Sequence, residues 1–178
     1  GEQHPRGIPH YNIGPQCGPA MIATIAKAFA AADPGNAASY RENAARFTAE
    51  VDAVILELRE KDTALKGVAV VEYHPDIVYL CEFYGMRIVG SIEPKAGVPP
   101  TAGHLRRLAQ TAKRERAALV VHNQSQSPRV AKSFASQAGC PVVKIANAVG
   151  AAKEVDTWTG LQRYNLERIL GALGGTVR

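Results

Sequence analysis

Aromatic residues and concentrated charge are both scarce in this chain of 178 residues. Phe, Trp and Tyr together make up 6% of it, and the formal net charge of +5 is spread along the sequence. The densest basic run, 113–116, is interrupted by Glu115. Proteins that bind single-stranded nucleic acid need basic surface interleaved with aromatic stacking platforms. The composition therefore argues against a nucleic-acid partner and favours a solvated basic surface.

Long hydrophobic runs and paired cysteines are also missing. No apolar stretch approaches the roughly 20 residues that span a bilayer, and residues 1–4 do not resemble a signal peptide, so we expect any export signal to have been removed or never to have been present. Cys17, Cys81 and Cys140 are widely spaced and form no CxxC pair. The hydrophobic content of 46% still allows a core that needs neither disulfides nor metals to hold it together.

The sequence contains no familiar catalytic motif. It has no GxSxG elbow, no Walker loop, no GxGxxG after a strand and no HExxH. Cys81 falls within an apolar helical stretch and Cys140 at the start of a strand, which is the wrong edge for a nucleophile. We therefore expect no enzyme activity.

The first part of the chain is predicted to be mainly helical. Residues 1–15 are rich in proline and glycine and predict a loop or an irregular strand end. A helix is expected over 18–32, with Pro19 in its first turn. A second, longer helix follows from a cap at Asn36 to about Asp62, with apolar residues from Tyr40 to Leu58 at the spacing of a single buried stripe.

After residue 67 the pattern changes to short β-branched runs that alternate with amphipathic segments. Such runs predict a parallel sheet of about four strands with helices on both faces, an α/β fold preceded by the long connecting helix. Right-handed crossovers place the carboxyl ends of all strands at one edge, where ligands bind in such sheets. The expected strands are 68–73, 86–92, 117–122 and 141–146, and the expected helices are 76–84, 101–115, 128–138 and 157–172.

Polar side chains gather at that predicted edge. His74 follows the first strand, His122 follows the third and Asn147 follows the fourth. A neutral histidine is a good ligand for zinc, and Asp76 would either support it or cap the next helix. His10, in a segment stiffened by prolines, is a second candidate ligand, whereas His4 and His104 are less promising. A structural, hydrogen-bonded role for each histidine remains an alternative.

Several motifs, taken in order, resemble those of the zinc- and manganese-binding solute receptors of ABC transporters. Residues 8–15, IPHYNIGP, are similar to the family's N-P-H-x-W-x-D-P segment, and residues 33–36, DPGN, to its D-P-x-N. Residues 73–76, YHPD, resemble its Y-H-D, and residues 92–97, IEPKAG, are close to I-E-P-K-P-G. Residues 164–166 match its Y-N-L.

The resemblance implies a periplasmic or extracytoplasmic protein of two lobes joined by a rigid helix, with the metal held between the lobes. On this mapping residues 1–15 are a remnant of the N-terminal lobe, 16–66 are connecting helices and 67–178 form the C-terminal α/β lobe. Most of the first lobe would be absent, so we expect a truncated chain.

The resemblance also carries over three metal ligands, one position at a time. His10 matches the histidine at the end of the first lobe, and His74 matches the second-lobe ligand, which is a histidine in zinc-type members and a carboxylate in manganese-type ones. Asn147 occupies the place of an aspartate, and a neutral amide is a poor zinc ligand. Pro75 and Gly14 also stand where acids are common.

The expected function is binding of zinc, with manganese as the alternative, for uptake through the membrane permease of an ABC transporter. Two or three ligands do not close a tetrahedral site, so weak or absent binding is expected from this chain alone. Other classes stay open. One is a degenerate relative that acts as an adhesin or scaffold or binds another solute; another is a small enzyme using His74, His122 and Asn147.

Overall fold

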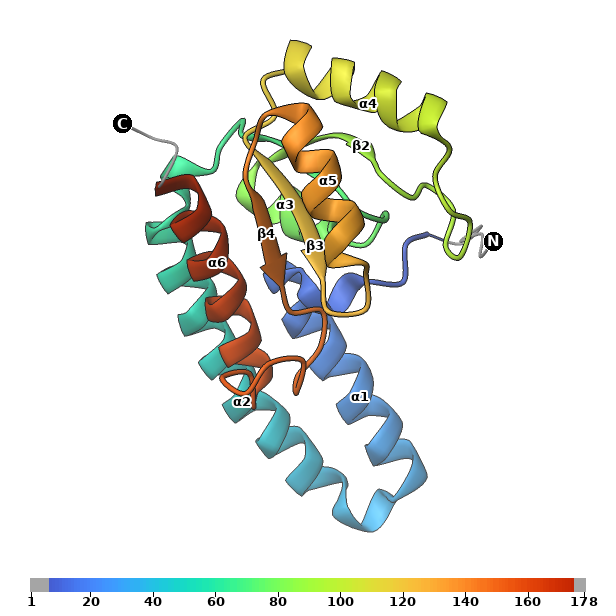
Figure 1. Cartoon of the computed structure of the whole chain (residues 1–178). Helices are drawn as coiled ribbons and strands as arrows, with labels where there is room; N and C mark the ends of the chain where they lie inside the picture. The colour runs from blue at the N-terminus through green and yellow to red at the C-terminus, as the bar shows by residue number, and fades with distance from the viewer. Residues whose placement is uncertain (1–6, 175–178) are drawn as a thin grey trace.

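A computed structural model describes residues 7–174, in which a helical hairpin leads into a parallel sheet covered by helices (Figure 1). Before the hairpin, the chain makes two short 3-10 turns, Tyr11–Ile13 and Pro15–Cys17, where a loop or irregular strand was expected. The helices are α1 (Gly18–Ala32), α2 (Ala37–Glu60), α3 (Val78–Tyr84), α4 (Ala102–Arg114), α5 (Pro128–Ala138) and α6 (Trp158–Gly174).

Within residues 7–174, four parallel strands form one sheet in the order β2-β1-β3-β4. The chain returns through a helix between successive strands, so the strands' carboxyl ends meet at one edge. The predicted α/β fold, with a parallel sheet of about four strands, is confirmed. The strands are β1 (Ala69–Glu72), β2 (Arg87–Ser91), β3 (Leu119–Asn123) and β4 (Val142–Ile145).

Two hydrophobic clusters lie on opposite faces of the sheet. Val70 of β1 belongs to the cluster that includes Leu80 of α3 and Leu161 of α6, together with the end of α2. Val71, the next residue along β1, belongs to the other cluster, which includes Phe134 of α5 and residues of α4. Successive side chains of a strand point to opposite faces, so this alternation fixes which helices cover which face.

The hairpin of α1 and α2 extends beyond the sheet (Figure 1). Our expectation of one buried stripe along α2 is wrong for its first half, because Val51, Val54 and Leu58 are buried whereas Phe47 is 37% exposed. Only the second half of α2 crosses the core; the first half packs against α1. The expected Asn36 side-chain cap is also absent, since Asn36 Nδ2 donates instead to Asp33 Oδ2 at 2.7 Å.

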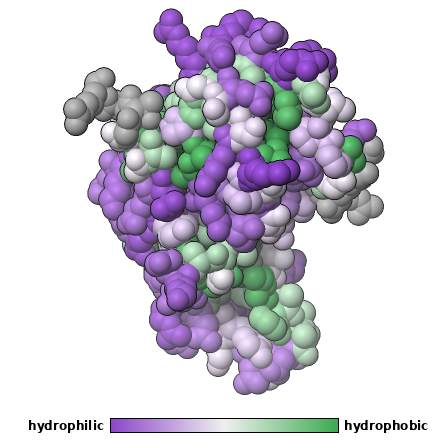
Figure 2. All heavy atoms as spheres, viewed as in Figure 1, coloured by the Kyte–Doolittle hydropathy of each residue, from purple (hydrophilic) through white to green (hydrophobic). Residues whose placement is uncertain are grey.

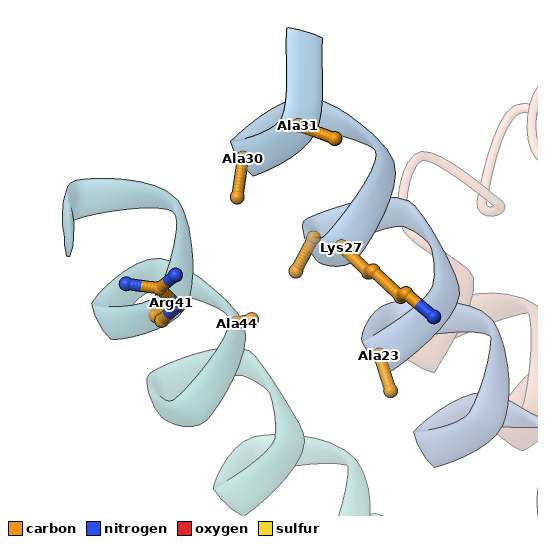
Figure 3. A pocket seen from close by; sticks show the side chains of 7 residues that line it. Ala23, Lys27, Ala30, Ala31, Arg41 and Ala44 are labelled. Carbon is orange, nitrogen blue, oxygen red and sulfur yellow. The ribbon is translucent and has the colours of Figure 1, made fainter. Parts of the chain in front are cut away.

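Hollows lie between the two helices of the hairpin. Figure 2 shows hydrophobic surface on this projecting part of the molecule, where Ile25 and Phe29 are each 55% exposed. Figure 3 shows a hollow on the hairpin in which alanines of α1 and α2 leave space beside Lys27 and Arg41. Neither the hollow at Ile25 and Phe29 nor the one beside Lys27 is lined by a histidine, cysteine or carboxylate. The candidate metal ligands lie at the sheet and not on the hairpin.

Candidate metal centre

A polar hollow of about 290 Å³ lies at the carboxyl edge of the sheet. Its walls come from the segment before α1, the ends of β1 and β3, the loop after β2 and the loop after β4. The structure thus brings together all three residues that the sequence singled out as metal ligands. The polar residues that line the hollow include His10, His74, Asp76, Asn123, Gln126 and Asn147.

His74 is held in one tautomer by a backbone carbonyl. Its Nδ1 lies 2.9 Å from the carbonyl oxygen of Glu93. A carbonyl oxygen only accepts hydrogen bonds, so Nδ1 carries the hydrogen and the neutral ring keeps its lone pair on Nε2. Metal-binding histidines commonly have this arrangement, in which the outer nitrogen is fixed by a carbonyl or carboxylate.

The turn after β2 places the Glu93 carbonyl. Glu93 N donates to Tyr73 O at 2.7 Å, so the two chain segments run side by side just beyond their strands. The Glu93 carboxylate accepts from Gly97 N at 2.7 Å, and Gly97 adopts a φ of 72°, which favours glycine. Sequence reasoning missed this role of Glu93, although the IEPKAG motif that contains it was the signal.

His10 and His74 face each other across the hollow. Their ring centroids are 6.2 Å apart and the rings are nearly perpendicular, at 83°. With zinc–nitrogen bonds of about 2.0–2.1 Å, two imidazoles on one tetrahedral ion have centroids roughly 5 Å apart. The observed separation of the centroids exceeds that value by about 1 Å.

Asn147 lies in the same hollow but its side chain is already occupied. Its Oδ1 accepts a hydrogen bond from Gln124 Nε2, and its backbone N donates to Gln124 Oε1 at 3.4 Å. Its backbone carbonyl accepts from Asn12 Nδ2 at 2.8 Å. Asn147 thus contributes a neutral oxygen with one lone pair engaged, which is weak ligation at most.

Asp76 supplies buried negative charge beside His74. Its Oδ2 accepts from Asn123 Nδ2 at 2.6 Å and from Gln126 Nε2 at 2.7 Å. Burial raises its pKa to about 6, while the nearby His74 and the two amide donors oppose that shift. Asp76 does not cap α3, since that helix begins after Ile77 without a side-chain cap. Its role is that of a neighbouring charge, with no hydrogen bond to the ring of His74 among those the structure gives.

A second acid, Glu72, lies at the end of β1. It is 3% exposed, and burial raises its pKa to about 7 even though Ser91 Oγ donates to Oε1 at 2.7 Å. Its Oε2 has no hydrogen-bond partner among the described residues. Composition and spacing gave no signal for this buried carboxyl.

Neither His104 nor His122 lines the hollow. The expectation that His122 follows the third strand is wrong, because β3 continues to Asn123 and buries His122, whose Nδ1 donates to Asn123 O at 3.0 Å. His104 Nε2 donates to Ser91 O at 2.9 Å. His4 lies outside the described residues. The enzyme alternative built on His74, His122 and Asn147 loses one of its three groups.

The cysteines are unsuited to nucleophilic chemistry. All three lie in the described part of the chain as free thiols, and burial raises the pKa of each. Cys81 is inside α3, as the sequence predicted, and is buried.

Within residues 7–174, no three His, Cys, Asp or Glu side chains converge closely enough to hold a metal. The arrangement therefore offers a pair of imidazoles and an amide, an incomplete set for a closed site.

The chain matches the family model of the zinc-uptake complex component A, periplasmic, over residues 2–172. It is 27% identical over 124 residues to the high-affinity zinc uptake system protein ZnuA of Brucella abortus. The aligned stretch covers 70% of this chain but 37% of that protein. The chain therefore spans less than half the length of this curated relative.

Solved structures share the fold. A crystal structure of ZnuA superposes with a TM-score of 0.76 at 25% identity, covering 92% of this chain and 61% of that one. A cadmium-bound periplasmic metal binding protein from Candidatus Liberibacter asiaticus superposes with a TM-score of 0.80 at 20% identity, covering 93% of this chain and 63% of that one.

No helix within residues 7–174 is long and apolar enough to span a membrane. The family's description places it in the periplasm and in zinc uptake, which agrees with the expected location. By the extent of this match, the chain belongs to the family of the periplasmic zinc-uptake component A, a family of metal-binding transport proteins.

Proposed function

We propose that this chain is the metal-binding C-terminal portion of a solute receptor that captures zinc, in preference to manganese, and delivers it to an ABC permease. The observation that carries the proposal is the pair of imidazoles, His10 and His74, at 6.2 Å across the polar hollow. The Glu93 carbonyl adds support, since it leaves the lone pair of His74 on Nε2.

The ligand types favour zinc. Imidazole nitrogen suits zinc, copper and nickel, whereas manganese prefers carboxylate and carbonyl oxygen. The family resemblance implies that His74 stands where manganese-type members carry a carboxylate, and that Asn147 stands in place of an aspartate. Manganese remains the alternative cation, since a neutral amide oxygen does not exclude it.

The proposed division of the chain explains why the site is incomplete. Residues 1–15 would end a first lobe, 16–66 would connect the lobes and 67–178 would form the second lobe. Two imidazoles and an amide leave at least one position of a tetrahedral zinc ion to water or to another part of a longer protein. We therefore expect this chain alone to bind zinc weakly.

The test is calorimetric titration of the metal-stripped chain with zinc and then manganese. His74→Ala is the main variant, and His104→Ala is the matched control because His104 bonds to Ser91 away from the hollow. We expect measurable zinc binding in the parent and in the control, weaker manganese binding, and loss of zinc binding in His74→Ala.

Two results would contradict the proposal. Zinc binding that survives His74→Ala would place the ion elsewhere. Absence of zinc binding by a longer protein that restores the first lobe would remove the receptor function itself.

A further inference from the structure

The segment that carries His10 is tied to the distant helix α6 through a single residue. The backbone carbonyl of Asn12 accepts two hydrogen bonds, from Trp158 Nε1 at 2.8 Å and from Gln162 Nε2 at 3.0 Å. Both donors lie near the start of α6, more than 140 residues later in the chain. Asn12 is two residues from His10, so this contact fixes the backbone just beyond the histidine.

The same residue also contacts Asn147, which lines the hollow. Asn12 Nδ2 donates to the carbonyl of Asn147 at 2.8 Å. Asn12 therefore joins three parts of the chain: the His10 segment, the loop after β4 and the first turns of α6. One asparagine, through its backbone and its side chain, thus connects two segments that line the hollow to helix α6.

The two donors are themselves held by packing. Gln162 is fully buried, so its amide has little freedom to exchange Asn12 for water. Trp158 lies against Gly18 at the start of α1, where an added Cβ would come within 2.7 Å of the indole ring. The absence of a side chain at Gly18 lets the tryptophan lie close enough to direct its N–H at Asn12.

We propose that Trp158 and Gln162 are positioning residues that hold His10 in reach of a metal bound at His74. The expected effect on metal affinity rests on the proposed function. The expected effect on the position of His10 can be tested without metal. A fixed His10 segment reduces the conformational freedom that the imidazole loses on ligation. Partners bonded directly to a metal ligand typically change metal affinity by about 10- to 100-fold, and we expect the lower end of that range for a contact two residues away.

The first arm of the test needs no metal. NOESY spectra of the metal-free chain should show cross-peaks between the ring protons of His10 and His74, whose centroids are 6.2 Å apart with one ring edge-on to the other. We expect the double variant Trp158→Phe, Gln162→Leu to lose these cross-peaks while retaining its helical circular dichroism. Phenylalanine keeps a ring beside Gly18 but has no N–H to donate.

Arg163→Leu provides the matched control. It also removes a contact of α6, the hydrogen bond from Arg163 Nε to Glu57 at 2.8 Å, but this contact leads to α2 and not to the hollow. The cross-peaks should persist in this control. If the double variant does not fold, the single variants Trp158→Phe and Gln162→Leu, each of which leaves one donor, should weaken the cross-peaks.

The second arm measures zinc affinity by calorimetry. The double variant should bind zinc about tenfold more weakly than the parent, and Arg163→Leu should bind it as the parent does. In a His10→Ala background the double substitution should have no further effect, because positioning residues act only through His10.

The outcomes separate this inference from the proposed function. Cross-peaks of unchanged intensity in the folded double variant would overturn the positioning role, whatever the zinc result. An equal loss of affinity with and without His10 would also overturn it. Loss of the cross-peaks in the double variant, together with zinc binding that survives His74→Ala, would uphold the structural tie and count against the proposed zinc site at His74.

Discussion

The side chain of Asn165 forms two hydrogen bonds with the backbone of Ala146. Asn165 Oδ1 accepts from Ala146 N and Asn165 Nδ2 donates to Ala146 O, both at 2.8 Å. The pair is buried, and it ties α6 to the residue that directly precedes Asn147. The Y-N-L motif of the family thus has a structural role here: its asparagine shapes the loop after β4.

Replacing this asparagine should destabilise the fold. In Asn165→Leu the buried N–H and carbonyl of Ala146 lose their partners, and each such loss costs about 1–3 kcal/mol. We expect the free energy of unfolding, measured with urea, to fall by about 2–4 kcal/mol. The control Asn43→Leu, on the exposed part of α2, should change it by less than about 0.5 kcal/mol. A loss no larger than that of the control would show that water replaces the asparagine.

Glu72 should make the folded chain less stable as the pH rises. Its ordinary pKa of 4.5 is raised to about 7 in the fold, mainly by burial. Between these values the unfolded chain has released the proton while the folded chain still holds it, so the free energy of unfolding falls from about pH 4.5 to pH 7 and then levels. The total fall from this group is on the order of 3 kcal/mol.

Glu72→Gln should remove that part of the pH dependence. Urea unfolding at intervals between pH 4.5 and 8 should give a flatter profile for the variant and greater stability than the parent at pH 8. Asp76, whose pKa is raised to about 6, still contributes a decrease, so the profile should flatten without becoming level. A variant profile parallel to that of the parent would mean that Glu72 is ionised in the fold throughout this range.

Restoring a carboxylate at position 147 should strengthen metal binding. In Asn147→Asp one oxygen can still accept from Gln124, and the added negative charge lies in the hollow that contains both histidines. We expect calorimetric affinities to rise about tenfold or more for zinc, and by a larger factor for manganese, which prefers carboxylate oxygen. Asn43→Asp on α2 adds the same charge away from the hollow and should have little effect. Equal gains from both variants would indicate a general effect of net charge.

The hydrophobic surface of the hairpin should bind apolar dyes. Ile25 and Phe29 are each 55% exposed and line the same apolar hollow on the hairpin, and contiguous apolar surface of this kind binds partners or dyes. Ile25→Ser combined with Phe29→Ser should lower the fluorescence of bound ANS markedly. Val149→Ser should not, since Val149 is similarly exposed but lies in the loop after β4. Undiminished fluorescence in the double variant would place the dye elsewhere.

The order and type of the helices and strands followed from the sequence. Residues 18–32 were predicted as a helix and form α1 with those bounds, and each predicted strand overlaps an observed one, although β3 extends one residue beyond its prediction. This was possible because these elements depend on local patterns: runs of β-branched residues, the spacing of apolar positions and the placement of proline and glycine. His74 was likewise placed at the carboxyl edge because it directly follows the first of the strands.

Two failures show the limit of local patterns. The apolar stripe of α2 continues through Phe47, yet periodicity does not say whether a partner covers that turn of the helix. His122 seemed to follow a strand, but β3 continues by one more residue and encloses it. In a strand one residue decides which face a side chain occupies, and strand ends are the least certain part of a sequence pattern.

The sequence by itself determined the α/β fold, the family and the candidate ligands, since these depend on patterns and motifs within short stretches. Only the tertiary structure decided how the ligands are supported. The bond from His74 to the Glu93 carbonyl, the double acceptance at Asn12 from Trp158 and Gln162, and the occupied amide of Asn147 all join residues that are distant along the chain. Such contacts depend on where folding brings each backbone carbonyl, and a linear pattern of residue types does not specify that position.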